Sequence, residues 1–572
     1  MKKSLFFIPA AALLMASCSN EDFDGNQQNG YDGPTETRYL SVNVVDNYTG
    51  TRAGEDDPVY ENGLEAENAV SYVRFYLFGQ TGSDYKNTSV NCTAEEVTNT
   101  QTPNVEKVLH SVIVFEAPQG STEPIQIVAV VNPPTGLADA YDTPAELQSK
   151  VADYGVATAG NFIMSNSVFK DNDGNEHVAY QISKSYSSRE EALLNPVDVY
   201  VERVVAKTRV KTSMNKVEGQ DYYTLTPAND AKVGAESGTA QVDVYNPTTE
   251  TLEATDVYVK LLGWNVTATA QESRLIKKIQ TTNWNSLAWD WNLPNSNRSF
   301  WAENPETVES ADALKLDNFT AAGTFGFNPT PATGEPLNYT YLQENASWTF
   351  DGKNPGKATK LIVAAQLVDA DGQGIDLAWW KGTYYTIDGL LQVLANETKV
   401  YSLADGKYTP LAATNLEFLT NKDANGGADR DYFSFAQLKG DLAGTNWYVK
   451  NGDGTYTQIS GNVTDAVNQI LLGLEVAKVW TGGHAYYWVD IAHLGKNGYG
   501  DFGVVRNHIY DYDLTMFQGF GIPVLDDDDV IDPETPNDPE YAFIAARLNI
   551  LSWRIVKHDD QSIGWESNRP TE

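Results

Sequence analysis

The residue types that commonly do catalytic chemistry are few in this chain and form no catalytic pattern. Six histidines stand at 110, 177, 484, 493, 508 and 558, and none belongs to an H-E-x-x-H zinc motif. The chain has no G-x-S-x-G nucleophile turn and no Walker A sequence. The 77 acidic residues offer many carboxylate pairs for glycoside hydrolysis, but a sequence does not give their separation in space. We predict no enzyme activity, no catalytic residue and no cofactor.

Three short patterns resemble binding loops but are better explained as turns. Residues 498–503 match G-x-G-x-x-G, yet an alternating strand follows them instead of the helix that a dinucleotide site requires. Residues 171–174 (DNDG) and 369–372 (DADG) begin like calcium loops, but both lack the later ligands and the final glutamate. Asp-Gly between strands is the ordinary hairpin signal. We therefore predict no metal site.

Two aromatic clusters could stack on sugar rings. They are NWNSLAWDWN at 283–292 and AWWKGTYY at 378–385. Trp and Tyr at alternate strand positions more often belong to the core and to cross-strand pairs, and we favour that interpretation.

The N-terminal sequence YLSVNVVDNYTGTRAG, residues 39–54, combines a strand with a protease-sensitive arginine. Leu40, Val42 and Val44 fall on one side of the strand, as expected where one face is buried. Arg52 and Ala53 follow in a polar, acidic segment. A core-quality strand thus lies directly upstream of a site that a trypsin-like protease could cut.

The first residues read as a secretory leader. Lys2 and Lys3 precede an apolar run at 5–16, and the small residues before Cys18 resemble a lipobox, which predicts that Cys18 carries a lipid. No second long apolar run follows, so we predict no membrane-spanning segment. Cys92 is the only other cysteine, and we predict no intrachain disulfide.

Composition bounds the class of protein. The formal net charge is −37, which argues against a nucleic-acid partner because phosphates would be repelled. A length of 572 residues, 41% of them hydrophobic, suits a globular protein of two or three domains.

Short apolar or alternating runs dominate the chain, which favours β-sandwiches. The expected strands lie at 70–78, 110–117, 124–132, 197–210, 256–268, 360–368 and 485–491. Few helices are expected. One begins at Thr143, with Pro144 and Glu146 in its first turn, and two others cover 386–396 and 464–474. A polar interval at 211–241 puts the main domain boundary near residue 215, and an acidic, proline-rich spacer covers 525–540.

A strand-forming tail follows that spacer at 541–558. Leu548 and Ile550 point to one side, and then the phase slips so that Leu551, Trp553 and Ile555 take up the apolar side. This predicts either two short strands or one strand with a bulge. Such a tail could pair with its own domain or with a neighbouring molecule.

In their order and spacing, these features resemble the fimbrillins of Bacteroidales type V pili, most closely the stalk subunits of the minor, Mfa-type fimbriae. The features are the lipobox Cys18, the strand ending in TRAG, IVAVVN with the capped helix after it, FIMSNS at 162–167, VERVVAKTRV at 201–210, YYWVDI at 486–491, VVRNHIYDYDLTMF at 504–517, the acidic spacer and LNILSWRIV at 548–556. The resemblance covers essentially the whole chain, apart from inserted stretches at 270–360 and 400–480.

The resemblance implies a mainly β fold of two tandem transthyretin-like, Greek-key β-sandwich domains with a few short helices. The implied divisions are a lipoprotein signal peptide at 1–17, a lipidated propeptide at 18–52 with a removable strand at 39–46, sandwich domains at 53–215 and 216–524, the linker at 525–540 and a donor-strand segment at 541–572. An arginine-specific protease would cut between Arg52 and Ala53. The donor residues would be Phe543, Leu548, Ile550, Leu551, Trp553 and Ile555.

The implied function is that of a structural pilus-stalk subunit that polymerises by protease-triggered donor-strand exchange and supports adhesion and biofilm formation. Its partners would be further copies of itself, anchor and tip subunits, the processing protease and the outer membrane, which holds the lipidated precursor before the mature form enters extracellular fimbriae. A fimbrial tip adhesin and a surface glycan-binding lipoprotein are the alternatives.

Overall fold

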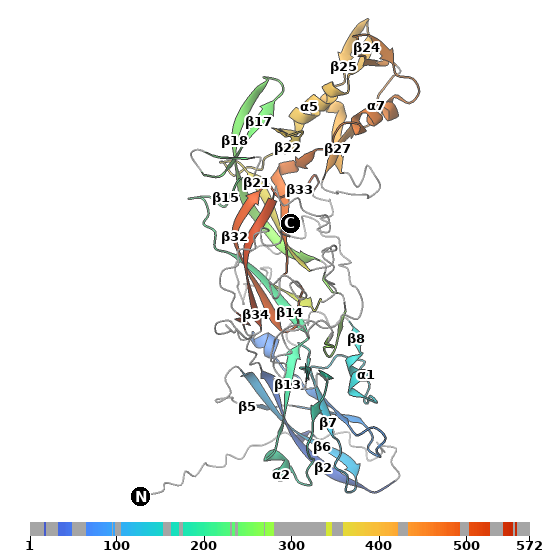
Figure 1. Ribbon diagram of the computed structural model, residues 1–572, viewed down its shortest axis with the longest axis vertical. Coiled ribbons are helices and arrows are strands. Elements are labelled where there is room, and N and C mark those ends of the chain that lie inside the picture. The colour runs from blue at the N-terminus through green and yellow to red at the C-terminus, as the bar shows by residue number, and fades with distance from the viewer. Residues whose placement is uncertain are drawn as a thin grey trace, which may run out of the picture.

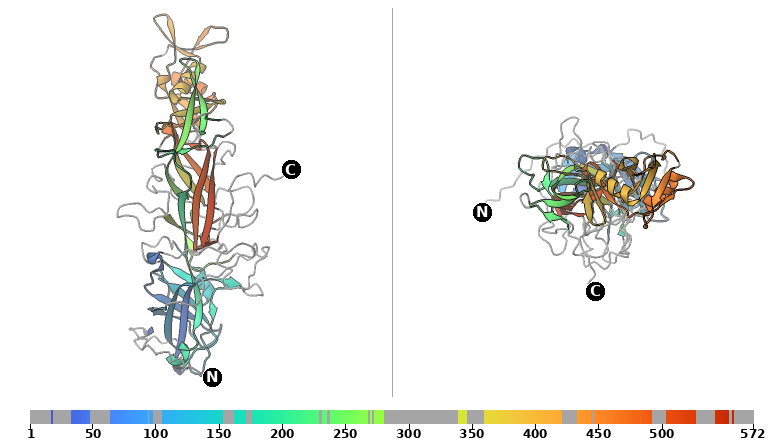
Figure 2. Two further views of the ribbon diagram at one scale, coloured as in Figure 1. Left: turned by 90° about the vertical axis from the view of Figure 1, so that its left-hand side faces the viewer. Right: turned by 90° about the horizontal axis from the view of Figure 1, so that it is seen from above.

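The computed structural model is a long, narrow molecule built mainly of strands (Figures 1 and 2). It describes residues 17–18, 33–47, 64–93, 95–97, 105–152, 162–170, 176–228, 231–234, 238–267, 269–270, 272–279, 339–345, 359–420, 433–444, 446–491, 503–526, 542–552 and 555–556. Three parts follow one another along the long axis: a lower part, an upper part and an end unit (Figure 1).

The lower part is built around one sheet of ten strands. Its order is β1-β6-β2-β13-β9-β7-β3-β4, with β12 on β7 and β5 on β6. The strands are β1 (Ser17–Cys18), β2 (Thr35–Asn47), β3 (Val73–Phe78), β4 (Thr88–Cys92), β5 (Glu95–Val97), β6 (Val105–Pro118), β7 (Gln126–Val131), β9 (Met164–Asn166), β12 (Tyr180–Gln181) and β13 (Val197–Arg203). A separate hairpin pairs β10 (Phe169–Lys170) with β11 (Glu176–His177).

Side-chain caps begin both short α-helices of the lower part, α1 (Pro144–Gln148) and α2 (Arg189–Leu193). The Thr143 hydroxyl accepts a hydrogen bond from the Glu146 N–H at 3.2 Å, and Pro144 takes the first helical position, as the sequence predicts. Ser188 caps α2 in the same way, a helix that the sequence analysis did not predict. A 3₁₀ turn, η1 (Glu65–Asn68), leads into β3.

The chain crosses from the lower part into the upper part at Val204, between β13 and β14 (Val205–Thr212). This lies before the boundary predicted near residue 215. β14 belongs to a five-stranded sheet of order β20-β14-β32-β34-β35. Its other strands are β20 (Tyr339–Gln343), β32 (His508–Gly519), β34 (Ala542–Ser552) and β35 (Ile555–Val556).

A second ten-stranded sheet packs on this five-stranded sheet. Its strands are β15 (Tyr223–Thr224), β16 (Lys232–Val233), β17 (Ala240–Asn246), β18 (Thr251–Thr267), β21 (Lys360–Val368), β22 (Leu377–Trp380), β23 (Thr383–Tyr385), β30 (Lys478–Trp480), β31 (His484–Asp490) and β33 (Ile522–Pro523). Val210 and Tyr512 of the five-stranded sheet share a core with Trp264 and Val363 of the larger one. The upper part is therefore a β-sandwich. A separate short antiparallel pair joins β8 (Val151–Ala152) to β19 (Ser273–Arg274).

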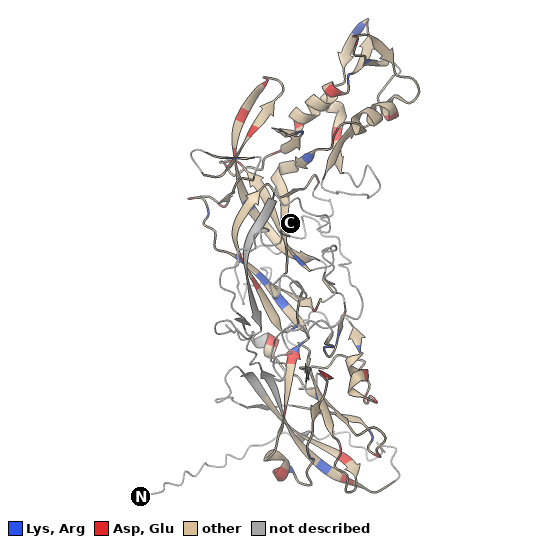
Figure 3. Ribbon diagram, viewed as in Figure 1, with Lys and Arg blue, Asp and Glu red and all other residues tan. Residues whose placement is uncertain are grey.

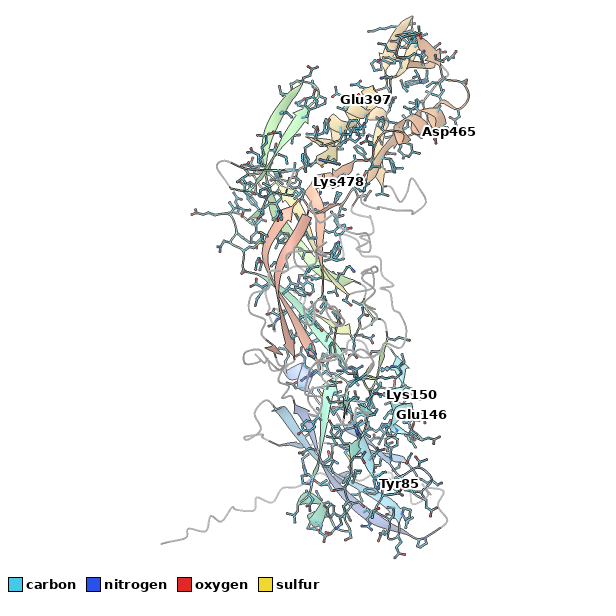
Figure 4. The ribbon with its side chains drawn as sticks, viewed as in Figure 1. Tyr85, Glu146, Lys150, Glu397, Asp465 and Lys478 are labelled. Carbon is cyan, nitrogen blue, oxygen red and sulfur yellow. The ribbon has the colours of Figure 1, made fainter. Side chains whose placement is uncertain are left out.

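The end unit occupies most of the inserted stretch at 400–480. It consists of α5 (Ile387–Glu397), β24 (Val400–Ala404), β25 (Lys407–Pro410), η4 (Ala413–Asn415), β26 (Leu416–Thr420), β27 (Ser434–Leu438), β28 (Trp447–Lys450), β29 (Tyr456–Gln458) and α7 (Val463–Leu472). The 3₁₀ turn η5 (Thr481–Gly483) follows β30. In Figure 4, Glu397 marks helix α5 and Asp465 marks helix α7 of the end unit, both far from Tyr85 in the lower part. Both predicted helices are present.

Several smaller predictions can be compared with the structure. Trp380, Tyr384 and Tyr385 are buried, which agrees with a core role for 378–385, whereas 283–292 lies outside the described residues. Asp369 forms a turn in which its carboxylate accepts from the N–H groups of Asp371 and Gln373, each at 2.9 Å. The predicted turns at 498–503 and 171–174 lie largely or wholly outside the described residues.

The described residues contain neither a membrane-spanning helix nor a metal-binding cluster, and one cysteine is disulfide-bonded. Across the described ranges, no helix has the length and apolar character to cross a membrane. The same ranges contain no group of three or more His, Cys, Asp or Glu that could hold a metal ion. Cys92 is disulfide-bonded, so the prediction of no disulfide is wrong.

Candidate functional site

The N-terminal strand β2 lies inside the lower sheet and not at its edge. It pairs antiparallel with β6 along its whole length, with Leu40 opposite Ile113. On its other side it pairs parallel with β13, with Val44 opposite Val199. Two neighbours therefore satisfy the backbone groups in the middle of this strand.

The middle of β2 is also buried on both faces. Leu40 and Val42 are 0% exposed and pack in one core with Phe75 and Ile113. On the opposite face the Ser41 hydroxyl is buried and lies 3.4 Å from His110 Nε2. The side chain of Val44 lies outside the described set. A strand with this environment would leave an apolar slot if it were removed.

Polar contacts hold the first residues of β2. The Glu36 carboxylate accepts hydrogen bonds from the Gly120 N–H at 2.9 Å and from Arg38 Nε at 3.0 Å. The Gly120 N–H, and then Arg38, lower the pKa of Glu36. Tyr39 exchanges two backbone hydrogen bonds with Tyr186, at 2.8 and 2.9 Å. These contacts are half-exposed, so they open more readily than the apolar middle of the strand.

The predicted lipidation position lies before β2 in the sequence, and the predicted cleavage position lies after it. Arg52 and Ala53 lie outside the described residues, and Arg52 follows the end of β2 by five positions. Cys18 is the last residue of β1, whose backbone pairs parallel with Val112 and Ile113 of β6.

The C-terminal tail pairs with its own chain. β34 runs antiparallel to β32, with Leu548 opposite Tyr512 and Ile550 opposite Tyr510. β35 then turns back on β34, with Ile555 opposite Leu551. β34 runs without a bulge through the predicted phase slip between Ile550 and Leu551, and the second strand begins only at Ile555. Phe543 also lies in β34, and Trp553 lies outside the described residues.

Several charged side chains that were not predicted from the sequence are buried where the lower and upper parts meet. Lys207 Nζ lies 2.8 Å from Glu67 Oε1, and the Tyr341 hydroxyl donates to the same oxygen at 2.5 Å. Burial opposes ionisation of Glu67, but the Lys207 charge and these hydrogen bonds outweigh it and lower the pKa of Glu67. Figure 3 shows both charge colours meeting at this level of the molecule.

Two further buried ion pairs lie at the same junction. Arg506 Nε contacts Glu344 Oε2 at 2.7 Å, and Lys277 Nζ contacts Glu202 Oε2 at 3.3 Å. Burial lowers the pKa of Lys277 although the Glu202 charge opposes this. The sequence did contain one indication of these buried charges, because charged residues interrupt the apolar run 197–210.

The comparisons with known proteins bear on the upper part. Residues 478–559 match the family model described as "Major fimbrial subunit protein type IV, Fimbrillin, C-terminal". This range begins at β30 and includes both β32 and the tail strands β34 and β35. The match shows that this C-terminal segment is similar to that of fimbrial subunit proteins. More particularly, these residues are similar to the C-terminal part of the fimbrillins.

Solved structures of low similarity include proteins of related description. A Parabacteroides distasonis protein ascribed a role in cell adhesion has 11% identity and a TM-score of 0.37, with 91% of this chain and 98% of that chain covered. The fimbrilin FimA of Porphyromonas gingivalis has 14% identity and a TM-score of 0.31, with 91% and 99% covered. The tip fimbrial protein Mfa3 of Porphyromonas gingivalis has 12% identity and a TM-score of 0.29, with 90% and 99% covered.

No curated protein sequence matches the chain significantly.

Proposed function

We propose that this protein is a structural stalk subunit of a cell-surface fimbria that polymerises when proteolysis frees a strand slot for the tail of another copy. The observation that carries the proposal is that the N-terminal strand β2 is buried on both faces and lies directly before Arg52. Cleavage between Arg52 and Ala53 would disconnect this strand from the folded body.

The burial of β2 explains why cleavage would be needed. Leu40 and Val42 are fully buried, and each contributes about 1.5–3 kcal/mol relative to an exposed side chain. While β2 is covalently attached, its effective concentration at the slot is in the millimolar range or above. A tail from a second molecule cannot compete with that strand until the connection is cut.

The pairing of the tail makes an exchange of strands favourable. In its own chain β34 pairs with β32 on one side, and on the other side with β35, which would move with it. The vacated slot offers two new partners, β6 and β13. A tail that leaves β32 would lose one ladder of backbone hydrogen bonds and gain two, together with the apolar pockets that Leu40 and Val42 occupied.

Membrane attachment through Cys18 forms part of the proposal and excludes one covalent alternative. The chain has two cysteines, and a lipid-bearing Cys18 sulfur cannot form a disulfide. Cys92 is disulfide-bonded in the structure, and a lipid-bearing Cys18 could not be its partner.

The tail also distinguishes a stalk subunit from a tip adhesin. A tip adhesin needs an acceptor slot but no donor strand, because no subunit follows it. The presence of β34 within the fimbrillin match favours a stalk position, between an anchor subunit and the tip. The processing enzyme would be an arginine-specific protease, and the mature form would lie outside the cell.

Variants of Arg52 test the trigger. After treatment with an arginine-specific protease, we expect the wild-type chain to form ladders that resist mild detergent, and we expect Arg52→Ala to stay monomeric. Arg52→Lys is the matched control because it keeps the positive charge. It should resist the arginine-specific protease but assemble after trypsin, which also cuts at lysine. Ladders from Arg52→Ala would refute the proposed trigger.

A further inference from the structure

The end unit has a small sheet with tyrosines on one face. Its order is β25-β24-β28-β29. The register places Tyr401 opposite Tyr448, Leu403 opposite Tyr408, and Lys450 opposite Tyr456. Because facing residues and alternate residues share a side of a sheet, all of these side chains lie on one face. We call Tyr401, Leu403, Tyr408, Tyr448, Lys450 and Tyr456 the tyrosine face.

The opposite face of this sheet supplies the core of the end unit. Val400 is buried there, and Trp447 and Val449 pack against the same core as Leu390 and Val467. The tyrosines therefore are not needed to cover this core. They are half-buried by one another and remain partly open to solvent.

Contacts between the rings hold the tyrosine face in a fixed shape. Tyr408 and Tyr456 stack with their centroids 3.7 Å apart and their planes 6° apart. Tyr401 stands edge-on to Tyr456 at 5.3 Å, and Tyr448 stands edge-on to Tyr408 at 5.4 Å. A pre-formed aromatic surface loses little conformational entropy when a ligand packs on it.

The charge of this sheet is opposite to that of the whole chain. Its four strands contain Lys407 and Lys450 and no acidic residue, whereas the chain has 77 acidic and 40 basic residues. The nearest acids in sequence, Asp405 and Asp453, lie on turns. Thr455 satisfies Asp453 through its N–H at 2.9 Å and its hydroxyl at 2.6 Å.

We propose that the tyrosine face binds an oligosaccharide that carries a carboxylate. The C–H face of a sugar ring suits the electron-rich face of a tyrosine, and phenolic hydroxyls pair with sugar hydroxyls. The Lys450 ammonium pairs with the carboxylate, because it is the one charged group on this face. A nucleic acid is a poorer ligand, since a chain of charge −37 repels a long polyanion.

The position of the face suits contact with a glycan on another surface. The sheet lies at the end of the molecule opposite the lower part, which holds β2 and β6 (Figures 1 and 2). The inference is independent of strand exchange, because none of its residues lies in β2 or β34.

The test compares acidic with neutral probes on the full chain. Binding of 3′-sialyllactose, tetragalacturonate and lactose is measured by ligand-observed NMR titration. We expect at least one acidic probe to bind about tenfold or more tightly than lactose. Lys450→Gln should remove this preference. Lys407→Gln is the matched control, because Lys407 lies on the same sheet but on the other face, opposite Ala404, and should change nothing.

A second variant examines the rings. Tyr448→Ser should lower the affinity for the acidic probe by about two- to tenfold, while the melting temperature of the chain stays within a few degrees of wild type. The proposal is overturned if neither acidic probe binds more tightly than lactose, or if Lys450→Gln and Lys407→Gln behave alike. It is also overturned if sedimentation shows that Tyr448→Ser abolishes self-association, since the occupant would then be a second copy.

Discussion

Leu40 packs in the lower core as part of a strand that, in our proposal, the mature protein no longer keeps. Leu40→Ala should lower the unfolding free energy of the precursor by about 2–5 kcal/mol, because it leaves a cavity in a fully buried site. The same substitution cannot affect a mature form that begins at Ala53. Urea unfolding of the precursor, with protease-treated protein for comparison, measures the difference.

Ile113→Ala provides the matched control for this prediction. Ile113 lies opposite Leu40 and is also fully buried, but it belongs to β6, which the mature body retains. It should destabilise both forms. An equal effect of Leu40→Ala before and after processing would mean that β2 stays bound to the cleaved body.

Local patterns at the residue scale predicted part of this site. The alternation of Leu40 and Val42 indicated their burial, and Thr143 indicated a helix start, because both signals come from neighbouring residues. The buried pair Lys277–Glu202 depends on two residues 75 positions apart in sequence. No local sequence pattern indicates that two residues so far apart in sequence are in contact, and charged residues are ordinarily expected at the surface.

At the scale of elements, removal of the tail strand β34 leaves β32 still paired with β14. β32 is paired with β14 as well as with β34. Deletion of 541–572 should therefore leave a folded, less stable body that accepts a tail but donates none. Added to wild-type chains after processing, the truncated form should shorten the ladders in proportion to its share.

Circular dichroism and detergent-resistant ladders measure the two parts of this prediction. The full-length Lys407→Gln variant, mixed at the same ratio, should leave ladder length unchanged. An unfolded truncated body would show that β34 is a structural strand of its own domain, and the donor assignment would then be wrong.

Element types were easier to predict than their partners. The apolar run 197–210 is continuous in sequence, but the structure divides it between two sheets at Val204. A hydrophobic pattern indicates that a residue is buried and does not indicate in which sheet. For the same reason the tail was predicted as strand, while its pairing with β32 depended on contacts that only the fold supplies.

At the scale of the whole molecule, the orientation of the lower part relative to the upper part depends on the contacts at their junction. Hydrophobic residues and buried ion pairs lie together at the junction: Val204, Leu275 and Val505 share one core, close to the Lys207–Glu67 pair. Buried charges need partners in a defined geometry, so such pairs favour one orientation of the two parts over others. A fixed orientation suits the repeating filament subunit that we propose.

Glu67→Gln tests this junction through its dependence on pH. Removing the carboxylate leaves Lys207 buried without its counter-charge, so the unfolding free energy at neutral pH should fall by about 3–5 kcal/mol. The pKa of Glu67 is lower in the folded chain than its ordinary value of 4.5, so its contribution is present above that value. The contribution is lost as the pH falls through the folded pKa, and the difference between wild type and variant should therefore shrink on acidification.

Chemical unfolding measured between about pH 3 and pH 7 gives this difference directly. Glu146→Gln is the control: its 3.9 Å contact with Lys150 is solvent-exposed, so its loss should cost less than about 1 kcal/mol (Figure 4). Small-angle scattering should show a wider spread of lengths for Glu67→Gln than for Glu146→Gln, because Glu67 lies in the lower part and Lys207 in the upper part. A stability difference that does not change with pH would show that Glu67 does not hold the junction through its charge.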